Sequence, residues 1–416
     1  MRIDERLEPE DAALLARVGE IAAEWGEGAY LVGGPVRDLL LERPTPDIDI
    51  AIEGPVEELT VALARRLDAR IQKTTDFMTS TLVLDDGLEV DIARTRTERY
   101  PEPGALPEVT PASLAEDLGR RDFSVNAMAM SLDPRRFGEL LDPHGGRHDL
   151  QRRQLRVLHE CSFEDDPTRM LRAARFLLRL QFTLEPWTAS LLERAVEERR
   201  TAAVSGARLR NELECIFHEA PARGLAMLDE LRLLEGMGLT EASRAACEAS
   251  RMVPRAAREM EVDLSEIDPL ICAFGIYVGL SEQDGGGLAV RLMLDASARD
   301  AILQAAALIE RTPGVLTGSE PDSALFFALR GLRPAAAVGL WTVLDEKARA
   351  RLQHYWHDLR RTRADVGGAD LIAAGYEPGP EFSEALETAL RAKLDKRADR
   401  EEQLAIALRL LERTSA

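Results

Sequence analysis

The chain has 416 residues, of which 45% are hydrophobic, and its formal net charge at pH 7 is -20. This length exceeds the size at which one hydrophobic core usually divides, so two or more domains are expected. The four cysteines are scattered, which excludes a disulfide scaffold. Neither an apolar run of roughly 20 residues, as a spanning helix needs, nor a signal-peptide pattern is present. The sequence therefore predicts a soluble, cytoplasmic protein.

The first elements are predicted to be a helix, a strand and a tight turn. Apolar residues at positions 14, 15, 18 and 21 have helical spacing, and a short apolar run at 30–32 leads directly into Gly33 and Gly34. Residues 47–52 then alternate Asp or Ala with Ile. In a strand this alternation puts Asp47 and Asp49 on one face and the three isoleucines on the other.

A hairpin follows, because residues 81–84 and 88–93 flank the turn pair Asp86-Gly87. Its second strand carries Asp91. The proline-rich segment 101–111 is predicted to be a loop. Beyond residue 150 the strand signals end and long helical patterns replace them, with breaks at 284–287, 312–314 and 366–368. The fold class is therefore expected to be α+β, a small mixed-sheet head followed by an all-helical remainder.

Asp47 and Asp49 are candidate metal ligands. Two carboxylates on one strand face suit a hard cation such as Mg²⁺, which prefers carboxylate, phosphate and water oxygens. Upstream, Gly33 and Gly34 would let backbone N–H groups approach a triphosphate, and Arg37 would lie in the first turn of the next helix with its guanidinium near the same phosphates. Asp91 on a neighbouring strand would complete a two-metal arrangement; a solvated edge-strand acid is the alternative.

These residues carry a resemblance. The string LVGGPVRDLLLERPTPDIDIAIEG at 31–54 resembles the core of the class II, bacterial-type tRNA nucleotidyltransferase and poly(A) polymerase family, within the DNA polymerase β-like superfamily. The segment from Asp91 to Tyr100, EDLGRRDFSVNAMA at 116–129 and SFEDDPTRMLRAARF at 162–176 are similar to further motifs of that family, in the same order. The resemblance implies a nucleotidyltransferase head at 1–150, a helical neck with the base-selecting motif at 151–215, a helical body at 216–330 and a tRNA-binding tail at 331–416.

The resemblance also implies roles for individual residues. Asp47, Asp49 and Asp91 would be catalytic, and the other residues would bind the nucleotide. Asp166 and Arg169, one helical turn apart, would read the base edge without a template. The remaining nucleotide-binding residues would be Gly33, Gly34 and Arg37 around the phosphates, Arg121, Asp122 and Asn126 at the sugar, and Arg172 and Arg175 farther along the helix.

The implied activity is addition of CMP and AMP from CTP and ATP to the 3′ end of tRNA, with Mg²⁺ as cofactor and no membrane partner. The net charge argues against a nucleic-acid partner, but residues 120–180 contain twelve arginines against nine acidic residues and are locally positive. The oligomeric state is left open.

Two departures from the family pattern keep alternatives open. Asp165 stands where the base-selecting motif usually has Glu, and the segment 97–110 lacks a basic Arg-Arg-Pro-like stretch. In this family a loop there helps the change from CTP to ATP, so a member that adds only CC or only A is the main alternative. A poly(A) polymerase and a catalytically silent RNA-binding relative are less favoured, the first because no basic C-terminal extension is found, the second because Asp47, Asp49 and Asp166 are intact.

Overall fold

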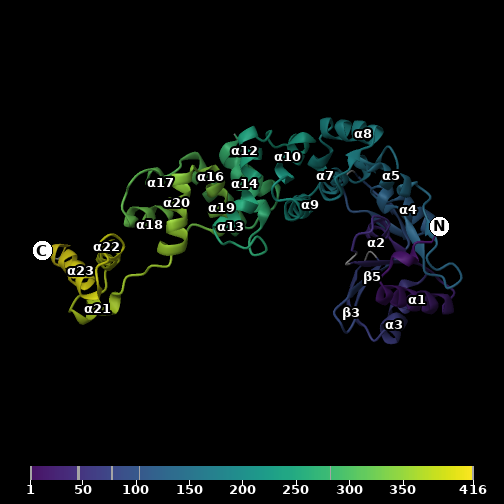
Figure 1. Ribbon diagram of the computed structural model, residues 1–416, viewed down its shortest axis with the longest axis horizontal. Helices are drawn as coiled ribbons and strands as arrows, with labels where there is room; N and C mark the ends of the chain where they lie inside the picture. Colours follow the sequence, from purple (N-terminus) through teal and green to yellow (C-terminus); the bar gives the residue numbers. More distant parts are fainter. Residues whose placement is uncertain (1, 45–46, 76–77, 103, 282, 415–416) are drawn as a thin grey trace. The chain divides into compact units, whose positions relative to one another are not determined.

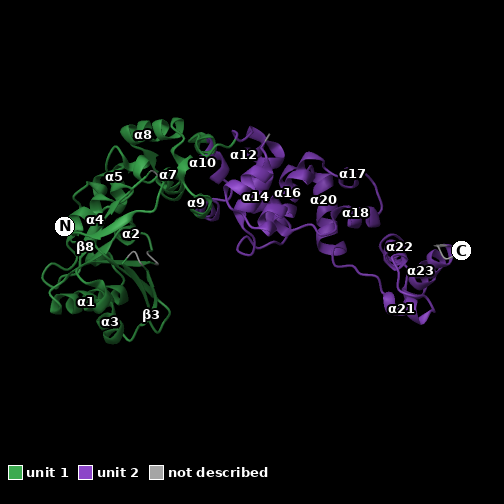
Figure 2. Cartoon of the chain, turned by 180° about the vertical axis from the view of Figure 1, so that it is seen from behind, with its two compact units in different colours: residues 1–212, 230–239 green, residues 213–229, 240–416 purple. Residues whose placement is uncertain are grey.

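The structure is a computed structural model that describes residues 2–44, 47–75, 78–102, 104–281 and 283–414. The chain divides into two compact units (Figure 2). Unit 1 comprises Met1–Glu212 and Glu230–Leu239, and unit 2 comprises Leu213–Asp229 and Thr240–Ala416. All strands of the described residues lie in unit 1, and the later part of the chain is helical (Figure 1). This confirms the expected α+β class, whereas the division into four parts stays a prediction.

A seven-stranded mixed sheet lies at the centre of unit 1, in the order β3-β4-β5-β2-β1-β8-β9. The predicted hairpin is confirmed, since β4 and β5 are antiparallel and Gly87 in their turn has φ +88°. β5 also pairs in parallel with β2. The strands are β1 (Gly28–Val32), β2 (Ile48–Glu53), β3 (Arg70–Thr75), β4 (Thr79–Val83), β5 (Glu89–Arg94), β8 (Ala129–Ser131) and β9 (Leu140–Leu141).

The two faces of β2 have different neighbours, as its alternating sequence predicts. Ile48, Ile50 and Ile52 are buried. On the other face Ala51 packs with Leu114 and Leu118 of α4 (Leu114–Gly119). Helices α1 (Pro9–Glu24) and α3 (Val56–Arg66) pack on the sheet on the side away from α4 (Figure 1). The face of β2 that carries Asp49 is therefore the one that looks toward α4 and the segments after it.

The rest of unit 1 consists of short helices and two small pairs of strands. Its remaining helical segments are η1 (Asp4–Arg6), α2 (Gly34–Leu40), η2 (Ser124–Asn126), α5 (Gly146–Arg152), α6 (Ser162–Asp165), α7 (Thr168–Leu180), α8 (Pro186–Glu197), η3 (Arg200–Ala203), the start of α9 (Gly206–Glu219) and α11 (Leu233–Gly236).

Two sequence predictions were wrong in part. The segment 101–111 is not all loop, because β7 (Glu108–Pro111) pairs with β6 (Arg96–Arg99) in a two-stranded sheet, and Pro103 lies outside the described residues. A two-stranded sheet has only edge strands, which tolerate the proline that ends β7. Strand pairing also continues beyond residue 150, in the short pair β10 (Gln154–Leu155) and β11 (Thr183–Leu184).

Unit 2 is built from helices that pack through small residues. A Cβ at Gly275 would lie 2.7 Å from the Cβ of Ala305, and one at Gly279 would lie 2.9 Å from the Cβ of Ile309, so α14 and α16 approach closely there. The helices of unit 2 are α10 (Gly224–Glu230), α12 (Arg244–Ser250), α13 (Val253–Glu259), α14 (Pro269–Leu280), α15 (Gly285–Arg291), α16 (Ala296–Glu310), α17 (Gly314–Thr317), α18 (Asp322–Leu329), α19 (Pro334–Val343), α20 (Glu346–His354), η4 (Tyr355–Leu359), α21 (Gly368–Ala373), α22 (Glu381–Lys396) and α23 (Arg400–Thr414).

Within the described ranges, no single helix has both the length and the apolar character needed to cross a membrane. Helices α18 and α19 together meet those criteria by length and composition, but a bend of 118° separates them.

Gly19 provides a test of how α1 packs on the sheet. An added Cβ would lie 1.8 Å from the backbone oxygen of Leu132, directly after β8. Alanine normally stabilises a helix interior relative to glycine by about 1 kcal/mol. Here we expect Gly19→Ala to destabilise the protein by about 1–3 kcal/mol instead, because the backbone must shift. Urea denaturation measures this free energy. Gly314→Ala in α17, where no atom lies within 4 Å of the added Cβ, is the matched control and should not destabilise.

Candidate active site

A cavity of about 430 Å³ in unit 1 collects the predicted site residues. Its lining includes all of them except Asp91, which lines an adjoining cavity of about 160 Å³ that also contains Asp49 and Arg121. The predicted residues in the larger cavity are Gly33, Gly34, Arg37, Asp47, Asp49, Arg121, Asp122, Asn126, Asp166, Arg169, Arg172 and Arg175. The structure therefore brings together residues from the sheet, the turn after β1 and the helix α7.

Two parallel strands, β2 and β5, carry acidic residues of the two adjoining cavities. Asp49 of β2 and Asp91 of β5 are direct partners in the strand register. Thr81 on β4 donates a hydrogen bond to Oδ1 of Asp91 (2.6 Å). Burial, together with the negative charges of Asp91 and Asp47, raises the pKa of Asp49 to about 6, although Arg121 opposes this shift.

This crowding of negative charge is what a divalent cation would relieve, so the carboxylates fit the expected metal. The described residues do not, however, include a cluster of three or more Asp, Glu, His or Cys side chains set to enclose an ion. A site built from two aspartates and the oxygens of a bound phosphate is the arrangement usual for Mg²⁺. The role of Asp91 stays a prediction.

The turn after β1 requires glycine at its first position. Gly33 has φ +73°, and a Cβ there would lie 2.8 Å from Nη1 of Arg121. Its N–H donates to the carbonyl of Met128 (3.2 Å), so this amide is already used within the protein. Gly34 begins α2, where the first N–H groups of a helix have no intrahelical acceptor. Gly33 therefore makes room for the Arg121 side chain at the edge of the acidic end.

Asp117 holds Arg121 and Arg120 in place. Arg121 donates to Oδ2 of Asp117 (2.9 Å), and Arg120 donates to Oδ1 (2.7 Å). Burial would raise the pKa of Asp117, but the two guanidinium groups outweigh it and lower that pKa. Arg120 also donates to Glu98. The sequence spacing of Asp117, three and four residues before the arginines, was a signal that could have identified it.

The buried Asp122 forms an ion pair with the partly exposed Arg172, between the segment after α4 and α7. Nε and Nη2 of Arg172 donate to Oδ2 of Asp122 (2.9 and 2.7 Å). Asn126 donates to the other oxygen (3.0 Å). Burial alone would raise the pKa of Asp122, but Arg172 and Asn126 hold it at about 2. The pair is ionised throughout the neutral range.

Arg37 lies in α2 as expected and is bonded within the protein. It is 3% exposed, and its Nε and Nη2 donate to both oxygens of Asp38 (2.9 and 2.8 Å). Its Nη1 donates to Oδ1 of Asn126 (2.7 Å). All three nitrogens thus have protein acceptors, so Arg37 orients Asn126 from the cavity wall. Its predicted contact with nucleotide stays a prediction.

Asp166 lies before α7 and not on it. It has an extended backbone (φ -132°, ψ 94°), because the residue before a proline is disfavoured in the helical region and Pro167 follows. Its Oδ1 accepts from the backbone N–H and the hydroxyl of Thr168 (3.1 and 2.7 Å) and from Nη2 of Arg208 (2.8 Å). Asp166 and Arg169 were expected on one face of a helix. Instead, Asp166 lies at the C-cap of α6, and only Arg169 lies in the first turn of α7.

Arg169 is 4% exposed and donates to neutral oxygens. Its Nη1 donates to Oγ of Ser162 (2.8 Å), and its Nη2 donates to the carbonyl of Arg120 (2.6 Å). Arg175, by contrast, pairs with Glu212 (3.3 Å), which also pairs with Arg172 (3.3 Å). Arg169 thus lines the cavity with no carboxylate bonded to its guanidinium in the described contacts.

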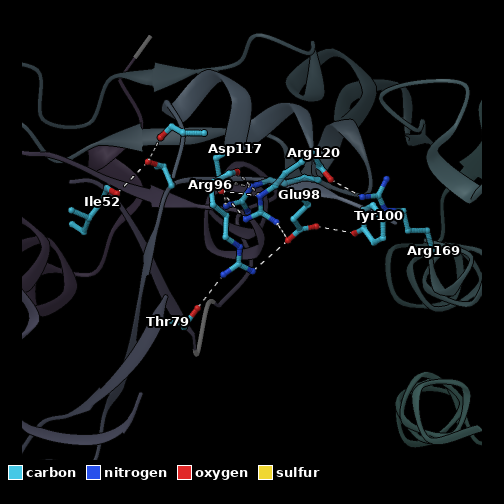
Figure 3. A network of polar contacts seen from close by, with 11 residues as sticks. Ile52, Thr79, Arg96, Glu98, Tyr100, Asp117, Arg120 and Arg169 are labelled. Atoms are coloured by element: carbon cyan, nitrogen blue, oxygen red, sulfur yellow. Dashed lines mark hydrogen bonds and ion pairs between the residues drawn. The ribbon is translucent and has the colours of Figure 1, made fainter. Parts of the chain in front are cut away.

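Glu98 and Tyr100, to which no role was assigned, form one wall of the cavity. The Tyr100 hydroxyl donates to Glu98 (2.8 Å), whose other oxygen accepts from Arg120 and Arg96. Figure 3 shows Glu98 between this arginine pair and Tyr100, with Arg169 next to Tyr100. Burial and Glu98 raise the pKa of the Tyr100 hydroxyl. The similarity of the segment from Asp91 to Tyr100 to a family motif was the signal that could have identified them.

Two further lining residues were missed by the sequence analysis. The Phe176 ring lies 5.4, 5.7 and 5.2 Å from the guanidinium carbons of Arg37, Arg172 and Arg175, which are distances of cation–π contacts. Arg179 pairs with Asp38 (3.6 Å). Both stand on α7 at helical spacing from Arg172, which could have indicated that they share its face.

Comparisons with known proteins agree with the geometry. Residues 29–156 match the Poly A polymerase head domain family. The chain is 32% identical to an A-adding tRNA nucleotidyltransferase of Geobacter sulfurreducens over 96% of this chain and 47% of that protein, and 32% identical to a CCA-adding enzyme of Geobacillus stearothermophilus over 91% of each. A solved CCA-adding enzyme in complex with CTP covers the whole chain with a TM-score of 0.85 and 30% identity.

The chain spans about half the length of several curated relatives that it matches. Its match to the Geobacillus stearothermophilus enzyme extends over nearly the full length of both chains. From the motifs, the cavity and this match, the chain belongs to the class II, bacterial-type tRNA nucleotidyltransferase and poly(A) polymerase family, which includes the CCA-adding enzymes.

Proposed function

We propose that the chain adds CMP and AMP from CTP and ATP to the 3′ end of tRNA without a template. One observation carries the proposal: a single cavity contains both the acidic pair Asp47 and Asp49 and the polar pair Asp166 and Arg169. The first pair suits the phosphate end of a nucleoside triphosphate with its cation, and the second suits the base edge. The names of the relatives, which add A or CCA to tRNA, support the same activity.

In this proposal Asp47 and Asp49 hold Mg²⁺, and Asp91 assists from the adjoining strand. Bound magnesium would supply charge neutralisation on the triphosphate and lower the pKa of the attacking hydroxyl. Arg121, fixed by Asp117 beside Asp49, places a positive charge at the same end. The tRNA 3′-hydroxyl attacks the α-phosphate in line and pyrophosphate leaves, so the protein contributes mainly position and electrostatics.

Asp166 and Arg169 select the base. A carboxylate accepts a hydrogen bond from the exocyclic amine that cytosine and adenine share, and a guanidinium donates to ring acceptors. Uracil and guanine present mismatched groups there, which leaves buried polar atoms unpaired at about 1–3 kcal/mol each. In the same proposal Asp122 and Asn126, which bond Arg172 and Arg37, contact the sugar.

A member that adds only A is the second candidate. It is favoured by the A-adding relative that aligns with 96% of this chain. The base-reading pair does not separate the two activities, because it accepts both cytosine and adenine.

We also propose that unit 2 holds the tRNA by shape and phosphate contact. The protein is proposed to work in the cytosol, consistent with four free cysteines.

The first test uses tRNAs that lack the last one, two or three nucleotides. Purified protein is incubated with each tRNA and with CTP and ATP together in Mg²⁺, one of the two nucleotides being labelled at a time, and the product lengths are read on a sequencing gel. The proposal expects CCA completion of all three tRNAs. Extension of only the tRNA that lacks the terminal A would support the A-adding candidate, a product ending in CC would support a CC-adding enzyme, and a long A tract would support a poly(A) polymerase.

Asp47→Ala tests the acidic pair. Removing one of two metal-binding carboxylates is expected to reduce nucleotide incorporation by at least about 1,000-fold, since the charge on the phosphates is no longer balanced. The fold should persist, because Asp47 is exposed. Asp85→Ala, an exposed aspartate in the turn between β4 and β5, is the control and should retain activity. Substantial incorporation by Asp47→Ala would remove the metal assignment.

Asp49→Asn tests the charge crowding through stability. The folded protein holds the Asp49 proton more tightly than the unfolded chain, so the ionised carboxylate costs stability as the pH rises through about 6. In EDTA, Asp49→Asn should therefore stabilise the protein by about 1–2 kcal/mol at pH 8 and by much less at pH 4.5. Mg²⁺ should stabilise the natural protein more than the variant, and urea denaturation measures both effects. Equal stability of the two proteins at pH 8 would contradict the crowding.

A further inference from the structure

Asp149 is a buried acid that the proposed reaction does not use. It stands in the middle of α5, is 4% exposed and does not line the cavity of the active site. Its Oδ2 accepts a hydrogen bond from Oγ of Ser124 (2.5 Å) and another from Nε of Arg156 (2.8 Å). A buried carboxylate is stable only where it is paired and hydrogen-bonded, and these contacts meet that need.

Ser124, which Asp149 binds, begins the short turn η2 that carries Asn126. Ser124 is fully buried, and its N–H donates to the carbonyl of Arg156 (2.9 Å). Arg156 therefore supports Ser124 twice, through its own carbonyl and through Asp149. Asn126, two residues after Ser124, lines the cavity. One end of η2 is thus held inside the protein, while the other end meets the cavity.

Helix α5 is itself seated closely on η2. A Cβ at Gly146 would lie 2.1 Å from the carbonyl oxygen of Ser124, so the helix begins in direct contact with the turn. The carboxylate of Asp142 accepts from the N–H groups of Gly146 (2.7 Å) and Arg147 (3.0 Å), which fixes the first turn of α5. Because the start of the helix is fixed, Asp149 presents its carboxylate to Ser124 at a defined place.

The amide of Asn126 retains the capacity to bind a sugar hydroxyl. Its Oδ1 accepts from Nη1 of Arg37 (2.7 Å), and its Nδ2 donates to Oδ1 of Asp122 (3.0 Å). An amide has two N–H groups and two lone pairs, so one of each remains beyond these described contacts. A ribose 2′-hydroxyl both donates and accepts, and can use them. Hydrogen bonds weaken steeply when they are misaligned, so this contact depends on where the amide is placed.

We infer that Asp149 is a positioning residue, which through Ser124 sets the place of Asn126 and thereby the preference for ribose over deoxyribose. This inference rests on the proposed function, in which Asn126 contacts the sugar. The backbone of η2 carries the effect, because the N–H of Ala127 closes the turn on the carbonyl of Ser124 (3.0 Å). A side chain that supports a binding group from behind decides how precisely that group is held.

Equilibrium binding of CTP and dCTP in Mg²⁺ tests this role. Asn126→Ala is expected to reduce the preference for CTP over dCTP by about tenfold, which measures what the amide supplies. Ser124→Ala removes the hydroxyl that Asp149 binds, and Asp149→Ala removes its acceptor. Each should reduce the preference by about threefold or more, because the amide is no longer held at one place. Binding of dCTP should change little, since deoxyribose has no 2′-hydroxyl for the amide.

Ser250→Ala is the matched control. Ser250 in α12 is also buried, and its hydroxyl donates to the carbonyl of Pro221 (3.4 Å). The control loses a comparable buried hydroxyl and should leave the preference for CTP unchanged. Melting temperatures of all variants establish that they are folded during the measurement. If Ser124→Ala keeps the full preference, or weakens CTP and dCTP binding equally, the positioning role is wrong.

A variant that carries both Ser124→Ala and Asp149→Ala tests the path between them. If Asp149 acts through the Ser124 hydroxyl, the double variant should lose less than about twofold beyond the larger single effect. Independent, multiplying effects would overturn that path. Natural protein that binds dCTP as well as CTP, or an unchanged preference in Asn126→Ala, would overturn the proposed sugar contact and this inference with it. A preference that Asn126→Ala loses but Ser124→Ala keeps would overturn only the inference.

Discussion

The ion pair between the buried Asp122 and Arg172 joins the two segments from which the site is built. Asp122 follows α4 and Arg172 stands on α7, fifty residues later. Together with the hydrogen bond from Arg169 to the carbonyl of Arg120 and the ion pair of Arg179 with Asp38, this pair fixes the polar face of α7. Removing Arg172 would leave the buried carboxylate of Asp122 without its charged partner, which costs more than the pair itself contributes, whereas Arg172 also pairs with Glu212. The geometry of the cavity thus depends on charged contacts between distant segments.

The cavity also explains how a protein of net charge -20 can receive a polyanion. Most arginines of the lining are held by a carboxylate, as Arg37 is by Asp38 and Arg121 by Asp117. Such pairs fix the donors in place but offset part of their charge. Arg169 donates to neutral oxygens, so its positive charge is offset less than that of the paired arginines. Fixed donors act on a ligand more strongly than mobile surface arginines would, because they need no reorganisation when the ligand binds.

Local sequence patterns predicted the acidic end well. The alternation around Asp49 and the Asp86-Gly87 turn were enough to place β2 and the β4–β5 hairpin. They could do so because strand faces and tight turns depend on neighbouring residues. The position of Asp166 was predicted less well, although Pro167 already disfavoured a helical backbone before it. The segment 101–111 was read from its prolines alone, which do not exclude an edge strand.

The contacts that the sequence could not predict are those between distant segments. Arg37 bonds Asn126, 89 residues away, and Arg208 bonds the backbone of Gly104, 104 residues away. An arginine near a glycine turn looks the same in a sequence whether its partner is a phosphate or an asparagine. Every residue has a backbone carbonyl, so the identity of a residue does not show which donor its carbonyl binds. Such partners become visible only when the packing of the chain is known.

Phe176 has a consequence of a different kind. Its ring lies against three guanidinium groups at once, and it is itself 3% exposed. A free arginine side chain carries about 2 kcal/mol of rotamer entropy, which a ligand must otherwise remove when it binds. Against this ring, much of that ordering has occurred before any ligand arrives. One uncharged side chain thereby adds to the ordering that carboxylates impose on three charged ones, and its replacement by a smaller apolar residue would alter the cost of binding without changing a single charge in the cavity.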